Sequence, residues 1–479
     1  MTGSPAARPS DAIEDGAWAF AHDELVDTLR ELIRIPSVNP APEPGGDGEL
    51  RAARLVAAVL EDAGLAPEVV EPFPGRGSVH ARLRGDGTGG EPLLLLSHVD
   101  VVPAPADLWT HDPFAADIED GYVWGRGAVD MKNMVALELE VMRLLAAETR
   151  AAGRDPATDR VPGLRRDILL TSTADEEAGG LQGAGWVVEN RPEWLRAAGA
   201  LNECGGVSVT VGGRRLYPIQ VAEKGFSVYR ITVNGTWGHG SMPREDNAAV
   251  LAAAVIARLA VPGPVRVTPV MTRFLEAAAA ALPADVARAL LGLIDGDSGR
   301  AEAALRVVCD PTYARALAAL LRDTISPDVV HAGIKYNVIP GEATIEIDCR
   351  VLPGTTEPDI RAQVLERIGP ELAAACEVEL VIFGAPAESP ADSAMYELLA
   401  RTVRDHDPDG VPVPVMVPFA TDAKHLAKLG VPAYGFSPLL LEPGERFLDR
   451  FHGVDERVGL DALRWGLPVL YDVVRRFCG

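Results

Sequence analysis

Basic residues are scarce in this chain of 479 residues, where 45 Lys and Arg stand against 69 Asp and Glu, for a formal charge of −24. A protein that binds nucleic acid needs a basic face to replace the counterions along the phosphates. The composition therefore argues against a nucleic-acid partner. The acidic surplus is typical of a soluble surface, and part of it also fits a cation site.

Cysteine pairs and long apolar runs are missing as well. The five cysteines are widely spaced and form no CxxC pair, so we expect no disulfide framework and a reducing compartment. The start of the chain, MTGSPAARPSDAIEDGAWAF, lacks a basic segment followed by an apolar one and does not predict a secretory signal. Apolar runs such as 93–96 are too short to cross a bilayer. We expect a cytoplasmic protein with no membrane partner.

The first part of the chain predicts an α/β sheet. One hydrophobic core rarely extends over so long a chain, so two domains are expected. Short apolar strands at 79–83, 93–101 and 168–174 alternate with helical stretches such as 134–147. Buried strands that alternate with helices indicate a sheet covered on both faces.

A different order begins near residue 223. The strand GFSVYRITVNG is followed by a helix at 247–259, a long Ala- and Leu-rich stretch, the strands KYNVIP and EATIEIDCRVLP, another helix and a last strand. This β-α-β-β-α-β order predicts an inserted split-βαβ (ferredoxin-like) domain at 223–386. The α/β domain would then consist of residues 1–222 and 387–479.

The strand LLLLSHVDVVP places His98 and Asp100 on one side of the chain, at the polar end of a buried run. Open α/β sheets bind their ligands at this end of the strands. A histidine there can bind a metal while a carboxylate two residues later orients its ring. A buried histidine satisfied only by the neighbouring aspartate fits the pattern equally well.

Three further carboxylates lie in a turn before a helix or at the end of a strand. Asp130 ends the Gly-rich segment YVWGRGAVD just before a helix, where it would bridge two cations or simply cap the helix. Glu176 and Glu177 end the strand DILLTSTADEE. Adjacent carboxylates repel each other unless a cation or a proton lies between them, although solvated surface glutamates are an alternative.

Two more segments complete the set, LNECGG with Glu203 and FHGVDERV with His452. The chain resembles the M20 metallopeptidase family in five motifs, which occur in the order HVDVVP, GRGAVDMK, TADEE, LNE and HGVDE. This family includes carboxypeptidase G2-like enzymes, aminoacylase-1, succinyl-diaminopimelate desuccinylase and carboxypeptidase S. The resemblance extends from about residue 20 to the C-terminus. It implies a zinc-peptidase catalytic domain with an inserted lid and dimerisation domain.

The resemblance also implies two Zn²⁺ ions, with Co²⁺ or Mn²⁺ as other possibilities. Asp130 would bridge them, His98 and Glu203 would complete one site, and Glu177 and His452 the other. Imidazole and carboxylate are ligands that zinc accepts at about 2.0–2.2 Å.

Two neighbouring carboxylates would serve the chemistry. Glu176 would act as the general base, taking a proton from the attacking water and delivering it to the leaving amine. Asp100 would orient His98. The implied reaction is hydrolysis of an amide bond.

The inserted domain would supply substrate contacts. The resemblance implies that His239 reaches the active site of a partner subunit and stabilises the oxyanion, which makes the protein a homodimer through this domain. Asn337 in YNVIPG and Arg350 in DCRVLPG match residues that contact substrate. An arginine there would bind a free carboxylate beside the cleaved amide.

Some segments depart from the family pattern. Cys204 follows Glu203 where relatives often have glycine, Lys424 replaces a usual arginine, and GFSP stands where a Gly-Pro-Gly turn is common. The long stretch 264–323 resembles the carboxypeptidase S and long N-acyl-amino-acid hydrolase branch. We expect hydrolysis of N-acyl amino acids or small peptides with a free carboxylate. The alternatives are a dipeptidase or carboxypeptidase, a non-catalytic zinc-binding scaffold, and a dimer whose metals are only structural.

Overall fold

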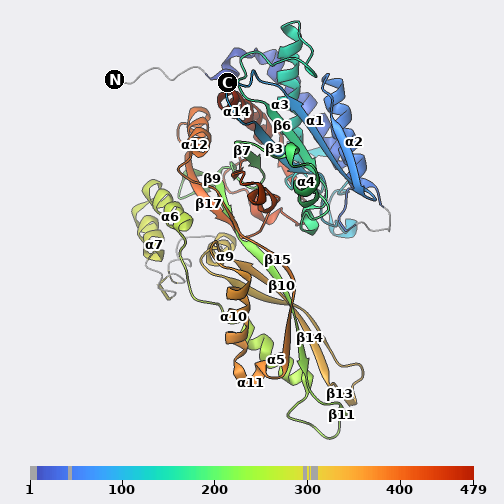
Figure 1. Ribbon diagram of the computed structural model, residues 1–479. Helices are drawn as coiled ribbons and strands as arrows, with labels where there is room; N and C mark the ends of the chain where they lie inside the picture. Colours follow the sequence, from blue (N-terminus) through green and yellow to red (C-terminus); the bar gives the residue numbers. More distant parts are fainter. Residues whose placement is uncertain (1–7, 41–45, 295–298, 301–302, 304–310) are drawn as a thin grey trace. The chain divides into compact units, whose positions relative to one another are not determined.

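The computed structural model describes residues 8–40, 46–294, 299–300, 303 and 311–479. The chain divides into two compact units, which are described separately (Figure 1). Unit 1 comprises Met1–Val221, Ser389–Val415 and Thr421–Gly479, and unit 2 comprises Ala222–Glu388 and Met416–Ala420.

A mixed sheet forms the centre of unit 1, in the order β1-β2-β6-β3-β7-β18-β9. The neighbours β6, β3, β7 and β18 run parallel, so their carboxyl ends meet at one edge. This confirms the α/β class predicted from the alternation of strands and helices. The strands in this order are β1 (Glu68–Phe73), β2 (Arg76–Leu83), β6 (Ile168–Thr173), β3 (Leu93–His98), β7 (Gly199–Asn202), β18 (Ala433–Gly435) and β9 (Arg214–Glu223), and β8 (Val209–Val211) and β17 (Val411–Val417) also pair with β9.

Helices cover both faces of this sheet, which is why every residue of β3 and β6 is buried. On one face α3 contacts β3 and three other helices. On the other face Leu94 and Leu96 form a core cluster with Val187 of α4 and Leu426 of α13. The helices are α1 (Asp15–Ile33), α2 (Gly48–Asp62), α3 (Lys132–Ala151), α4 (Ala184–Asn190), α12 (Ala394–His406), α13 (Ala423–Leu426) and α14 (Leu460–Cys478).

A small three-stranded sheet of unit 1 joins distant parts of the chain. Its order is β19-β5-β4. It consists of β4 (Ile118–Glu119), β5 (Tyr122–Trp124) and β19 (Arg457–Gly459). Arg457 pairs with Trp124 and Val458 with Val123, so the end of the chain lies beside the segment that leads into α3.

Unit 2 contains a four-stranded antiparallel sheet in the order β12-β14-β10-β15. Its buried residues form one core with α5 and α10. The elements are β10 (Gly225–Asn234), α5 (Ala248–Leu259), α6 (Pro269–Ala281), α7 (Ala284–Leu293), α9 (Pro311–Leu320), β12 (Thr324–Ala332), β14 (Glu342–Val351), α10 (Glu357–Ile368) and β15 (Cys376–Gly384).

The second strand of the inserted domain differs from the prediction. KYNVIP contributes only β13 (Val338–Ile339), which pairs with β11 (Gly238–His239) outside the main sheet. The edge strand is instead β12, whose register shifts between Pro327 and Val329. Its proline and its mostly exposed side chains remove the apolar alternation by which a strand is recognised. Part of the Ala- and Leu-rich stretch before it lies outside the described residues.

Among the described residues, no helix combines the length and the apolar character that crossing a membrane requires.

Candidate metal centre

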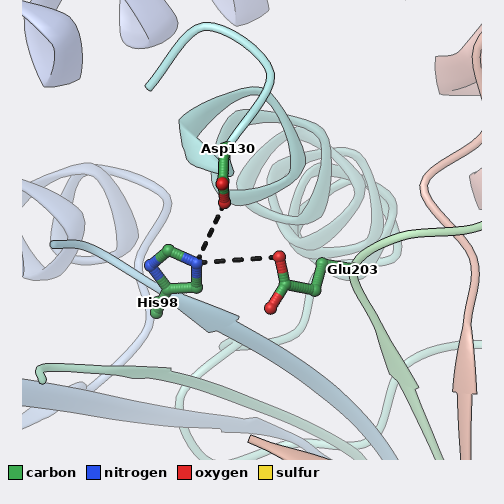
Figure 2. A group of neighbouring side chains, drawn as sticks. All are labelled: His98, Asp130 and Glu203. Atoms are coloured by element: carbon green, nitrogen blue, oxygen red, sulfur yellow. Dashed lines mark ion pairs between the residues drawn. The ribbon is translucent and has the colours of Figure 1, made fainter. Parts of the chain in front are cut away.

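His98, Asp130 and Glu203 meet at the carboxyl edge of the unit 1 sheet (Figure 2). His98 ends β3, and Glu203 directly follows the parallel neighbour β7. Asp130 lies in the turn before α3. His98 Nε2 is 3.4 Å from Asp130 Oδ1 and 3.7 Å from Glu203 Oε2.

A second group shares Asp130. His452 Nε2 lies 3.3 Å from Asp130 Oδ2 and 3.1 Å from Glu177 Oε2. Glu177 belongs to the turn η3 (Glu176–Ala178), which follows β6. In each group the candidate ligand atoms all lie within 4.8 Å of one another. The two oxygens of Asp130 therefore face one group each, as a bridging carboxylate requires.

The donor atoms of these groups fit divalent cations. His98 Nε2 and Glu177 Oε1 are buried and have no hydrogen-bond partner among the described residues. Buried polar atoms normally have a partner, so these two atoms suit a ligand. Two imidazoles with three carboxylates form a donor set that zinc accepts.

The pKa shifts of the two histidines also indicate a cation site. Burial alone would lower the pKa of His98, but Asp100, Asp130 and Glu203 outweigh it and raise that pKa well above its usual value. Hydrogen bonds to Asp130 and Glu177 raise the pKa of His452 to about 10. These carboxylates thus favour positive charge at both histidines, which a bound cation would supply instead.

The pKa values of the carboxyl groups of Asp130 and Glu177 shift in opposite directions. Burial would raise the pKa of Asp130, but the neighbouring imidazoles of His452 and His98 outweigh it and lower that pKa. Burial and the charge of Asp130 raise the pKa of Glu177 to about 7. Asp130 therefore stays ionised, whereas Glu177 needs a cation to be ionised at low cost.

Asp100 contacts two parts of the centre. Its Oδ1 lies 3.4 Å from His98 Nδ1, and its backbone carbonyl lies 3.0 Å from the same nitrogen. Its carboxylate also accepts the backbone N–H groups of Glu176 (3.1 Å) and Glu177 (3.0 Å) and the Asn39 side-chain amide (3.0 Å). Asp100 thus fixes the turn of both glutamates, and nothing in the sequence indicated the contribution of Asn39.

Glu176 lies beside a lysine. Lys424 Nζ is 3.5 Å from Glu176 Oε1 and 4.0 Å from Asp422 Oδ1, and it donates to the Thr421 carbonyl (2.9 Å). Burial raises the pKa of Glu176 well above its usual value, and Lys424 opposes this rise. The sequence identified Lys424 as a departure, but only the structure places it against Glu176.

The three remaining predicted residues belong to unit 2. His239 is exposed, with Nδ1 2.7 Å from Ser241 Oγ. The Asn337 carbonyl accepts the backbone N–H of Gly240 (2.9 Å), and its buried Oδ1 has no partner among the described residues. Arg350 Nε and Nη2 donate to both carboxylate oxygens of Asp348 (2.7 and 2.9 Å).

Comparisons of sequence place the chain in a peptidase family. The model of "Peptidase family M20/M25/M40" matches residues 94–476. A Xenopus tropicalis N-fatty-acyl-amino acid synthase/hydrolase PM20D1 is 29% identical over 92% of this chain and 83% of its own length. The probable carboxypeptidase S-like 2 of Dictyostelium discoideum is 30% identical, covering 80% and 71%. Human aminoacylase-1 is 28% identical, covering 94% and 95%.

Solved structures share the fold. An M20 family metallo-carboxypeptidase from Sulfolobus solfataricus superposes with a TM-score of 0.68 at 18% identity, covering 95% of this chain and 99% of that one. The Bacillus subtilis YXEP protein, a dinuclear metal-binding peptidase of the M20 family, gives 0.56 at 14% identity, covering 97% and 99%.

Proposed function

Because the chain belongs to peptidase family M20/M25/M40 and is a metallohydrolase of amide bonds, we propose that it is a two-zinc enzyme whose substrates are N-acyl amino acids with a free carboxylate. The observation that carries the proposal is that the two oxygens of Asp130 face separate ligand groups, 3.4 Å from His98 and 3.3 Å from His452.

We assign the ligands by these groups. His98, Asp130 and Glu203 would hold one ion, and Asp130, Glu177 and His452 the other. When bound there, the ions supply Lewis acidity toward the scissile carbonyl and the attacking water. Asp100 orients the His98 ring and fixes the turn that presents Glu177.

Glu176 is the proposed general base. It belongs to neither ligand group, and it lies directly beside the ligand Glu177. Its carboxylate takes the proton from the attacking water and delivers it to the nitrogen of the leaving amine. Lys424, 3.5 Å away, favours the ionised carboxylate that must accept the proton.

The substrate class has two sources of support. Relatives that align with most of this chain are named as an N-fatty-acyl-amino acid synthase/hydrolase and as an aminoacylase. Arg350 would bind the carboxylate of the substrate, for which it must share or leave its present partner Asp348. We also propose that the enzyme is a homodimer through unit 2, with His239 stabilising the oxyanion in the partner's site and Asn337 contacting the substrate.

A second candidate is a dipeptidase or carboxypeptidase with the same ligands. The Dictyostelium and Sulfolobus relatives are named as carboxypeptidases, which favours this candidate. The two activities differ in the acyl side of the substrate, because a dipeptide carries a free amine there.

One experiment tests both candidates. Zinc-loaded protein is given N-acetyl and long-acyl amino acids, free dipeptides, and the same compounds with amidated C-termini, and products are measured by mass spectrometry. Glu176→Gln is the control. We expect cleavage of N-acyl amino acids with free carboxylates only, and its loss in Glu176→Gln. Cleavage of dipeptides alone would favour the second candidate. No cleavage at all would favour a zinc-binding scaffold, and full activity of Glu176→Gln would reject the base.

A further inference from the structure

Glu456 lies four residues after His452, and its side chain is fully buried. Its carboxylate accepts hydrogen bonds only from the short segment that leads to Asp130, as far as the described residues show. The donors are Arg126 Nη1 (2.6 Å) and the backbone N–H groups of Gly127 (3.1 Å), Val129 (2.7 Å) and Asp130 (3.1 Å).

These four donors use both oxygens of the carboxylate. Oε1 accepts the N–H groups of Val129 and Asp130, and Oε2 accepts Gly127 N–H and Arg126. A glutamine in the same place would turn an NH₂ group toward two of these donors. The position therefore requires a carboxylate and not merely a polar side chain of this size.

The turn that presents Asp130 cannot form from helix or strand conformations alone. Gly127 has φ +88°, and a Cβ there would lie 2.9 Å from side-chain atoms of Lys132 and Val101. Such a turn leaves backbone N–H groups without helical or strand partners, and Glu456 accepts three of them.

The same contacts connect the turn to His452. Arg126 Nη2 donates to the Gly453 carbonyl (2.9 Å), and the backbone carbonyl of Glu456 accepts Gly125 N–H (2.9 Å). Pairing of β19 with β5 extends this connection. Two segments far apart in sequence are thereby joined where Asp130 Oδ2 and His452 Nε2 lie 3.3 Å apart.

We propose that Glu456 is a positioning residue of the metal centre, which fixes the bridging carboxylate of Asp130 relative to His452 through backbone amides. The proposal rests on the ligands assigned under the proposed function. Groups that orient metal ligands typically change metal affinity by about 10–100-fold when they are replaced. If Glu456 had a purely structural role, its replacement would change the unfolding temperature but not the zinc affinity of the folded protein.

The test measures zinc affinity and not activity. Zinc content is measured by mass spectrometry after dialysis against a series of zinc buffers, on protein that circular dichroism shows to be folded. We expect Glu456→Gln to bind the two ions about 10–100-fold more weakly. Glu140→Gln is the matched control, because Glu140 is also buried and paired with an arginine, Arg143 at 3.5 Å, outside both ligand groups. It should bind zinc as the wild type does.

Wild-type affinity in folded Glu456→Gln would overturn the proposal. Asp130→Asn shows whether only the role of Glu456 is wrong or also the ligand assignment of the proposed function. If Asp130→Asn also binds zinc as the wild type does, the ligand assignment itself is wrong. Should Glu456→Gln not fold, hydrogen exchange on metal-free wild-type protein decides. Slow exchange of the amides of Gly127, Val129 and Asp130 without zinc is the expected result, and protection that appears only with zinc would contradict the proposal.

Discussion

Lys424 Nζ lies 3.5 Å from Glu176 Oε1, and both side chains are largely buried. The lysine opposes the rise that burial causes in the pKa of Glu176. A general base must be ionised to accept a proton, so this cation would extend the range of pH in which Glu176, the proposed base, can act.

Lys424→Met should move the acidic limb of the kcat/KM profile to higher pH, because the pKa of Glu176 rises when the cation is removed. The loss of activity should therefore be largest at low pH and shrink as the pH rises. Lys428→Met is the control, since Lys428 is exposed on the following turn. An unchanged limb in Lys424→Met would show that the lysine does not act on the base.

Asp100→Asn should weaken zinc binding by about 10–100-fold, because Asp100 faces His98 and also accepts the N–H groups of Glu176 and Glu177. Competition with a chelator measures the affinity. Asp472→Asn is a matched control. Asp472 is fully buried, pairs with a histidine (His406, 2.7 Å) and accepts a backbone N–H, but it lies outside the metal centre. Equal zinc affinity in the two variants would contradict the assignment of Asp100.

His239→Ala should lower kcat by about 10²–10³-fold if His239 stabilises the oxyanion. If it acts across a dimer, mixing His239→Ala with Glu176→Gln should restore activity, because a mixed dimer has one site with both groups intact. The mixture is assayed after subunit exchange, with each variant alone as control. Failure to recover activity in a dimer that exchanges subunits would rule out action across subunits.

The buried carboxyl group of Glu138 should make the free energy of unfolding depend on pH. Burial raises its pKa to about 8 from an ordinary 4.5. Between these values the folded protein binds more protons than the unfolded chain, so the free energy of unfolding falls as the pH rises through this window. Glu138→Gln has no titrating group at this position. The Tm of the wild type should therefore fall relative to that of the variant by at least about 2 °C between pH 5 and pH 9. The exposed Glu397→Gln serves as control, and parallel Tm profiles for wild type and Glu138→Gln would contradict the prediction.

The family, the α/β class and the segments that supply the candidate ligands could be predicted from the sequence. Strand ends are visible as apolar runs that stop at polar residues, so the positions of His98 and Glu177 at the ends of two strands could be predicted from the residues, whereas their roles as ligands were implied by the family resemblance and stay predictions. Parallel neighbours such as β3 and β7 then bring their ends together. The other candidate ligands were predicted from the order of the family motifs, because each motif specifies which polar residue follows which strand.

Other parts of the site could not be predicted because their partners are distant in sequence. Glu456 contacts backbone groups near Asp130, and a backbone amide has no sequence signature. Asn39 reaches the centre from the loop after α1, and Lys424 reaches it from the short helix α13. The edge strand β12 was missed for a different reason, since its proline and its exposure remove the pattern that identifies strands.

The proposed mechanism depends on Asp130 bridging two ions. Anomalous diffraction at the zinc absorption edge, on crystals of zinc-loaded protein, would locate these ions. We predict two peaks roughly 3.5–4 Å apart, one between His98 and Glu203 and the other between Glu177 and His452, with an oxygen of Asp130 on each. A single peak, or two peaks that do not share Asp130, would contradict the mechanism.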